Sequence, residues 1–96
     1  MPVRNTTTDL MDAVKEAAGI KSDYALSKLL DLKPSGIGNY RHGRSQASDE
    51  VAFRMAGLLK RAPAPILAQL AADRASSPEL AKVWRDAAKV LARASR

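Results

Sequence analysis

Apolar residues recur at intervals of three and four along most of this 96-residue chain, which is the spacing of one face of an α-helix. Aromatic residues make up only 4% of the chain, and there are no runs of β-branched residues. The pattern therefore predicts an all-α protein, a compact bundle of about five to six helices in a single domain.

Capping residues, glycines and prolines predict where these helices begin and end. Residues 1–61 are expected to form a core that contains a helix-turn-helix, and residues 62–96 a helical pair that packs on the core, dimerises, or both. The Ala-Pro-Ala-Pro stretch at 62–65 is the one expected joint. The expected helices run from Thr6 to Ala18, from Ser22 to an end at 31–33, from about Pro34 to His42, from Ser48 to an end at 60–63, from about Pro65 to Ala75, and from about Pro78 to Ala92.

The composition argues against several functional classes. Without Cys the chain has no disulfides, thiolate nucleophiles or sulfur-based zinc sites, and a single His argues against a transition-metal site made of protein ligands alone. We therefore expect no cofactor and no metal. No uninterrupted apolar run exceeds four residues, and the first ten residues lack the apolar stretch of a signal peptide, so the expected location is the cytoplasm.

The net charge of +6 favours an anionic partner. Nucleic acid is the first candidate and a membrane surface the second. The last predicted helix is basic and amphipathic, but its apolar face is rich in Ala, which argues against membrane binding.

Residues 22–44 have the spacing of a helix-turn-helix, with two short helical stretches separated by three or four residues. The polar side of the second stretch is flanked by cations, and no acidic residue occurs between Asp31 and Asp49. The residues expected to pack the two helices together are Leu26, Leu29 and Leu30, Leu32 in the turn, and Ile37 and Tyr40.

This stretch resembles the helix-turn-helix of the phage repressor and Cro-type (lambda-repressor-like) family. The matching positions are Leu26-Ser27, Asp31-Leu32, Ile37 and Gly43, without a gap. Asp31 replaces the family's usual turn Gly and Ser27 replaces a small apolar residue. Asp23 stands where many relatives have a Gln that touches phosphate, so that contact is not carried over.

The resemblance implies a sequence-specific regulator that binds double-stranded DNA, with residues of about 34–42 in the major groove. We expect Ser35, Asn39 and His42 to contact base edges, because an Asn amide can bind adenine bidentately. Alternatively, Asn39 is a solvated helix residue and His42 only ends the helix.

Lys33, Arg41 and Arg44 are the expected phosphate contacts. Arg41 has a second role open to it, because many relatives have a charged pair that links the first and third helices. Glu16 or Asp12 would then supply the acid. Gly36 and Gly38 oppose helix formation, so the segment is either a Gly-rich loop or a helix that needs close approach to a neighbouring helix or a ligand.

Regulators of this type usually act as dimers on two-fold symmetric sites. The last two helices could supply the dimer surface, through faces that include Trp84 or Ile66, or they could close the core over the first and fourth helices. No catalytic arrangement occurs in the sequence, so we predict a binding protein and not an enzyme. An antitoxin that binds its own operator and a toxin is the alternative, and few aromatic residues are available for binding single strands or RNA.

Overall fold

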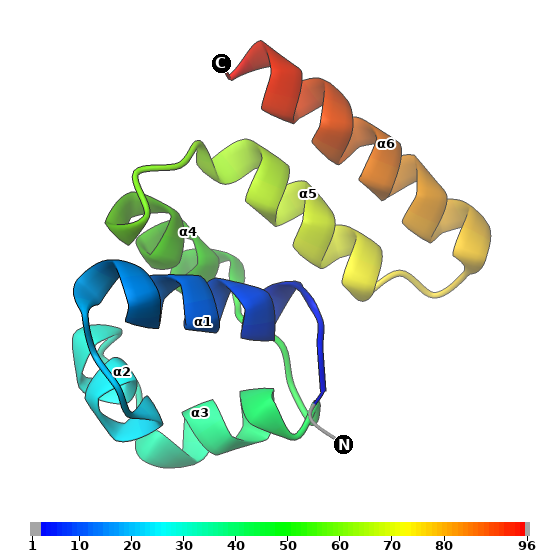
Figure 1. The fold of residues 1–96 in the computed structure, drawn as a ribbon. Coiled ribbons are helices and arrows are strands. Elements are labelled where there is room, and N and C mark those ends of the chain that lie inside the picture. The colour runs from blue at the N-terminus through cyan, green and yellow to red at the C-terminus, as the bar shows by residue number, and fades with distance from the viewer. Residues whose placement is uncertain (1–2, 96) are drawn as a thin grey trace.

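The computed structural model describes residues 3–95, and in this part of the chain all regular structure is helical. The fold is an all-α helical bundle, as the sequence predicts (Figure 1). Its helices are α1 (Thr6–Ala18), α2 (Asp23–Leu29), α3 (Pro34–Arg41), α4 (Asp49–Leu58), α5 (Pro63–Asp73) and α6 (Pro78–Ala94).

Side-chain caps determine where most of the helices begin. The hydroxyls of Ser22, Ser48 and Ser77 accept the backbone N–H three residues ahead, at 3.0, 3.2 and 3.1 Å. Each satisfies one of the backbone donors that lack a partner in the first turn. At α1 the cap is Asn5, just before the predicted Thr6, and it forms a reciprocal pair of hydrogen bonds with Thr8.

The connection between α4 and α5 lies a few residues earlier than the predicted joint at 62–65, because α5 already begins at Pro63. Both prolines of the stretch lie in the first turn of α5. Backbone N–H groups there have no partner within the helix, so a residue without an N–H costs little. The Pro pair therefore begins a helix and does not form a linker.

The turn between α2 and α3 is tight. Asp31 adopts a left-handed conformation with φ of 56°, as expected for a residue in place of the family's Gly. The N–H of Leu32 then donates to the carbonyl of Ser27 at 2.8 Å, and the side chain of Leu32 packs against the core. This geometry sets the direction in which α3 leaves the turn.

One core holds the first five helices together. It is formed where α1 packs on α2, α3, α4 and α5, and α4 also packs on α5. Leu29, which the sequence predicts to pack α2 on α3, is exposed outside this core, as are Ala17 and Ala18 of α1 and Leu58 of α4. The most deeply buried large side chains are Met11, Val14, Leu26, Leu30, Ile37, Met55 and Leu70.

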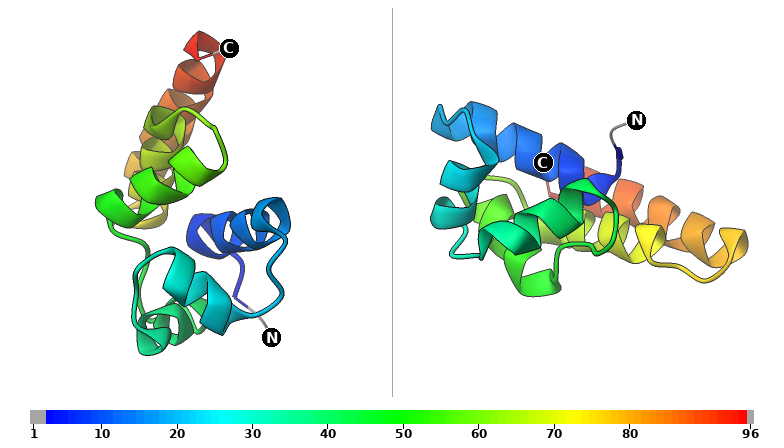
Figure 2. Two further views of the ribbon diagram at one scale, coloured as in Figure 1. Left: turned by 90° about the vertical axis from the view of Figure 1, so that its left-hand side faces the viewer. Right: turned by 90° about the horizontal axis from the view of Figure 1, so that it is seen from below.

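Helix α6 forms an outer layer. Within residues 3–95, α5 is the only helix that it contacts, so the prediction that both C-terminal helices close over α1 and α4 holds for α5 alone. The views in Figure 2 show α5 and α6 as a hairpin on one side of the bundle, with α2 and α3 on the other. No helix in the described part of the chain has the length and apolar character needed to cross a membrane.

Candidate nucleic-acid interface

Helix α3 is held to the bundle by one side. Ile37 and Tyr40, one turn apart, are buried against the core, and Leu26 and Leu30 of α2 are almost completely buried with them. These are the packing residues that the spacing of the sequence predicts. Because they fix the rotation of α3 about its axis, they also determine which of its residues face outward.

The outward side of α3 is polar. Lys33, Pro34 and Ser35 are exposed at its beginning, and Asn39 is half-buried one turn after Ser35. Pro34 occupies the first helical position, as predicted, and Lys33 gives no side-chain cap. Ser35 and Asn39 therefore lie on the same face of a helix and not in a coil.

Gly36 and Gly38 lie within this helix, which excludes the Gly-rich loop. A Cβ atom at either position would meet no described atom within 4 Å. The alternative that these glycines let a neighbouring helix approach closely is therefore wrong, because packing inside the protein does not require them. Because they are two residues apart on an α-helix, they lie on different sides of α3, one on each side of the face that carries Ser35 and Asn39.

Asn39 and Arg44 interact with each other. Nη1 of Arg44 donates to Oδ1 of Asn39 at 3.4 Å, and the N–H of Arg44 donates to the carbonyl of Asn39 at 2.9 Å. The first of these bonds is long and exposed, and therefore weak. The arrangement keeps a guanidinium beside the amide without engaging the amide nitrogen.

His42 ends α3. Its backbone N–H donates to the carbonyl of Gly38 at 3.0 Å, and its side chain is exposed. Gly43 follows with a left-handed φ of 74°, as the predicted end of the helix requires. His42 therefore has the capping position that was one of its two predicted roles.

Arg41 forms ion pairs that link three helices. Its Nε and Nη2 donate to Oδ2 and Oδ1 of Asp23 at 2.9 Å each, and its Nη1 lies 2.8 Å from Oδ1 of Asp12. Lys15 donates to Asp23 at 3.0 Å. Of the two roles considered for Arg41, these contacts are those of the interhelix link. They bear out Asp12 as its acid, whereas Glu16 is not among the ion pairs described.

The charges of this network stabilise one another. Hydrogen bonding from Arg41 lowers the pKa of Asp23, partly opposed by burial and assisted by Lys15. Hydrogen bonding to Asp23 raises the pKa of Arg41 in return. Sequence reasoning missed the role of Asp23. The only signal in the sequence was that an acidic residue directly follows the helix cap Ser22. Its contact with Arg41 in the last turn of α3 depends on how the helices pack.

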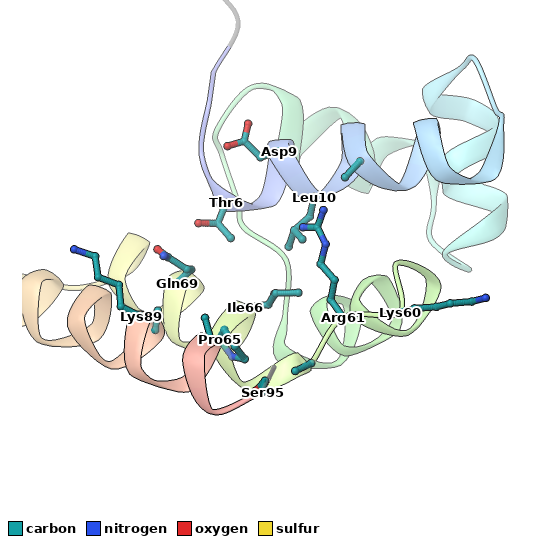
Figure 3. Close-up of a pocket in the computed structure, with 14 residues that line it drawn as sticks. Thr6, Asp9, Leu10, Lys60, Arg61, Pro65, Ile66, Gln69, Lys89 and Ser95 are labelled. Carbon is teal, nitrogen blue, oxygen red and sulfur yellow. The ribbon is translucent and has the colours of Figure 1, made fainter.

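The described residues also form an open groove of about 900 Å³, on the other side of α1 from α3. Leu10 and Ile66 lie at its centre, with Thr6 and Asp9 on the α1 side and Gln69 and Lys89 on the side of α5 and α6 (Figure 3). Among the described residues there is no group of three or more His, Cys, Asp or Glu side chains that could hold a metal ion, in this groove or elsewhere. The groove separates α6 from α1.

Comparison with known proteins adds one relative. The chain is 33% identical to the "Uncharacterized protein Gp-c" of Pseudoalteromonas phage PM2 over 85 residues, which are 83% of this chain and 91% of that protein. No protein-family model matches the chain. No solved structure matches it significantly.

Proposed function

The chain belongs to the same family as the uncharacterized Gp-c protein of Pseudoalteromonas phage PM2, and we propose that it is a sequence-specific regulator that binds double-stranded DNA. The observation that carries this proposal is the outward face of α3. Ser35 and Asn39 lie one turn apart on a helix whose opposite side is fixed by Ile37 and Tyr40. A helix exposed in this way can enter the major groove.

The charges around α3 support an anionic partner. Lys33 and Arg44 are exposed near its two ends, and Asp12 and Asp23, the acids that contact α3, are already paired with Arg41. Phosphate therefore meets cations at both ends of α3 without an unpaired carboxylate between them. Lys33 and Arg44 are the proposed phosphate contacts, and Arg41 acts by holding α3 in place.

Ser35 and Asn39 are the proposed contacts to base edges. The Asn39 amide nitrogen forms no hydrogen bond among the described residues, and its oxygen forms only the long bond to Arg44. Giving up that exposed bond for a bidentate contact to adenine costs little, and such a contact contributes about 1–3 kcal/mol of discrimination. His42, exposed at the end of α3, is the third proposed contact.

The open surroundings of Gly36 and Gly38, on either side of Ser35 and Asn39, support close approach of a ligand. Each Gly costs the helix about 0.5–1 kcal/mol relative to Ala, and nothing in the internal packing requires it. The absence of side chains at these two positions would allow the backbone of α3 to lie against the floor or wall of the DNA major groove.

A regulator of phage or prophage type, acting as a homodimer on its own operator, is favoured over an antitoxin because the relative is encoded by a phage. The test is a footprint of the full chain on the DNA upstream of its own gene, at two salt concentrations. We expect a short, two-fold symmetric protected site. Asn39→Ala should abolish the preference for this site over unrelated DNA while non-specific binding is retained.

The electrostatic part is tested with matched double variants. Lys33→Ala with Arg44→Ala should reduce the slope of log K against log salt by roughly 0.9 for each lost contact. Arg61→Ala with Lys89→Ala removes the same charges at exposed positions of the groove in Figure 3, and should leave the slope unchanged. Equal loss with both pairs, or no protected site at either salt concentration, would refute the proposal.

A further inference from the structure

Helix α6 carries an apolar face that the bundle does not cover. Val83 and Val90 are each 60% exposed, Leu80 is 42% exposed and Trp84, the only Trp, is 39% exposed. Figure 1 shows α6 at the edge of the molecule, and among the described helices α5 is its only neighbour. The residues of α6 that are buried against α5 are the small ones, Ala81 and Ala88.

The uncovered residues follow the repeat of a coiled coil. Exposed Leu80, Val83, Val90 and Ala94, with half-buried Ala87 between them, are spaced three, four, three and four residues apart in the order 80, 83, 87, 90 and 94, and we call these five residues the α6 seam. On a helix of 3.6 residues per turn the seam lies roughly a third of a turn from the α5 contact at Ala81 and Ala88. A second helix can therefore pack on the seam without displacing α5.

We infer that the α6 seam binds the α6 seam of a second copy of this chain, in antiparallel orientation. Charge complementarity identifies the occupant. Asp86 and Arg93 flank the seam on the side away from α5, one heptad apart. When two such helices run antiparallel, positions of this flank face each other, so that Asp86 pairs with Arg93 of the partner subunit, twice by symmetry.

A parallel pair lacks this complementarity. It would place Asp86 and Arg93 opposite the other flank of the partner helix, which holds Trp84 and Leu91 and carries no charge. In the antiparallel register that pairs the charges, Val90 packs against Ala87 of the partner subunit, and Trp84 lies against Leu91 of the partner subunit. Small and large residues thus alternate across the contact. The i,i+4 pair of Lys82 with Asp86 is exposed, so it does not compete strongly with the pairing between subunits.

This pairing also deepens the proposed function, and in that respect depends on it. The two-fold axis of an antiparallel helix pair is perpendicular to the helices and to the line that joins them. Since α5 lies in roughly that direction from α6, both cores lie on the same side of the pair. In each copy α3 lies across the core from α6 (Figures 1 and 2), so both α3 helices are directed to the same side. A single DNA duplex can then contact the α3 helices of both copies.

The experiment measures self-association of the full chain by sedimentation equilibrium, without DNA. We expect a dimer whose dissociation constant rises at least about tenfold for Val83→Glu and again for Val90→Glu, because each places an unpaired carboxylate in the contact. Both positions are 60% exposed, so the monomer stays folded. Arg85→Glu, which introduces a carboxylate on the polar side of α6, is the control and should not weaken the dimer.

Charge reversal tests the register. Asp86→Arg and Arg93→Asp should each weaken the dimer, and the double variant should restore it. A monomer at all concentrations, or a dimer that tolerates Val83→Glu with Val90→Glu, overturns the inference. So does a monomer whose Trp84 fluorescence shifts to the blue only with anionic phosphatidylserine vesicles, since a membrane would then cover the seam. DNA binding enters none of these measurements, so failure of the operator footprint with a dimer present refutes the proposed function alone.

Discussion

Asp23 and Arg41, the first residue of α2 and the last of α3, hold each other through two hydrogen bonds of 2.9 Å. Their side chains are 37% and 25% exposed, and Arg41 also reaches Asp12 of α1. A guanidinium and a carboxylate that share two hydrogen bonds are held in a fixed relative orientation as well as at a fixed distance. It ties the end of the proposed recognition helix to both helices behind it.

Arg41→Met should lower stability without changing contacts to DNA. Methionine keeps an apolar stem while the ion pairs to Asp12 and Asp23 are lost. After allowance for screening at these partly exposed groups we expect a loss of about 1–2 kcal/mol, or roughly 5–15 °C in Tm. Thermal unfolding followed by circular dichroism measures this. Arg44→Ala is the control and should leave Tm nearly unchanged. A lower salt slope at unchanged Tm in Arg41→Met would instead make Arg41 a phosphate contact.

Asp23 should make the protein sensitive to acid. Hydrogen bonding from Arg41 lowers its pKa below the ordinary value of 3.8. The stability that the carboxylate contributes is therefore fully present above about pH 4, and it is lost as the pH falls through the lowered pKa. Urea unfolding of the wild type and of Asp23→Asn from pH 6 to pH 2 should show a difference that is constant down to about pH 4 and then shrinks.

The pH effect has its own control in the Arg41→Met background. Without Arg41 the largest cause of the lowered pKa is gone, so Asp23→Asn should there produce a smaller difference at pH 6. A difference of the same size in both backgrounds would mean that Arg41 and Asp23 are not coupled.

Local signals predicted most of the secondary structure. Ser22, Ser48 and Pro34 have the chemistry of helix starts, and the structure uses all three as predicted. The two-residue error at α5 has the same local origin, since the Pro pair is compatible with both a linker and a first turn. Periodicity predicted the centre of the apolar face of α1 to α5, because that face follows from spacing, but it did not predict that residues at its edges, such as Leu29 and Leu58, are exposed.

Contacts between distant residues could not be predicted in the same way. Periodicity shows that Leu80 and Trp84 lie on the apolar side of α6, but it does not show whether a helix covers them, and in the described structure only α5 reaches α6. For Arg41 both a link and a phosphate contact were open, and the choice depended on where Asp12 and Asp23 lie in space. Which side chains far apart in the sequence contact one another depends on how all the helices pack.

Thr7 forms one such long-range contact, and replacing it should be costly. Its hydroxyl, fully buried in the first turn of α1, accepts the N–H of Ala47 at 3.0 Å across 40 residues of sequence. Thr7→Val keeps the shape but leaves this buried N–H without a partner, which costs about 1–3 kcal/mol. Urea unfolding measures the loss, and hydrogen exchange of the Ala47 amide should accelerate.

Thr7→Ser separates the hydroxyl from the methyl group. It keeps the acceptor for Ala47 and should retain slow exchange at that amide, even if the lost methyl lowers stability somewhat. Rapid exchange in both variants would show that packing around Thr7, and not its hydrogen bond, protects the loop between α3 and α4.

Gly36→Ala and Gly38→Ala should strengthen the fold while weakening DNA binding. A Cβ at either position meets no described atom within 4 Å, and Ala stabilises a helix interior by about 0.5–1 kcal/mol relative to Gly. Higher Tm is therefore expected from both. If the Ser35 and Asn39 face of α3 lies against DNA, the added methyl groups on either side of it should push the helix outward and reduce affinity for the operator. Gly57→Ala is the matched control, since Gly57 lies in α4 with equally open surroundings and should raise Tm without affecting affinity. Unchanged affinity in all three variants, measured by titration of labelled operator DNA, would mean that DNA does not approach the backbone of α3.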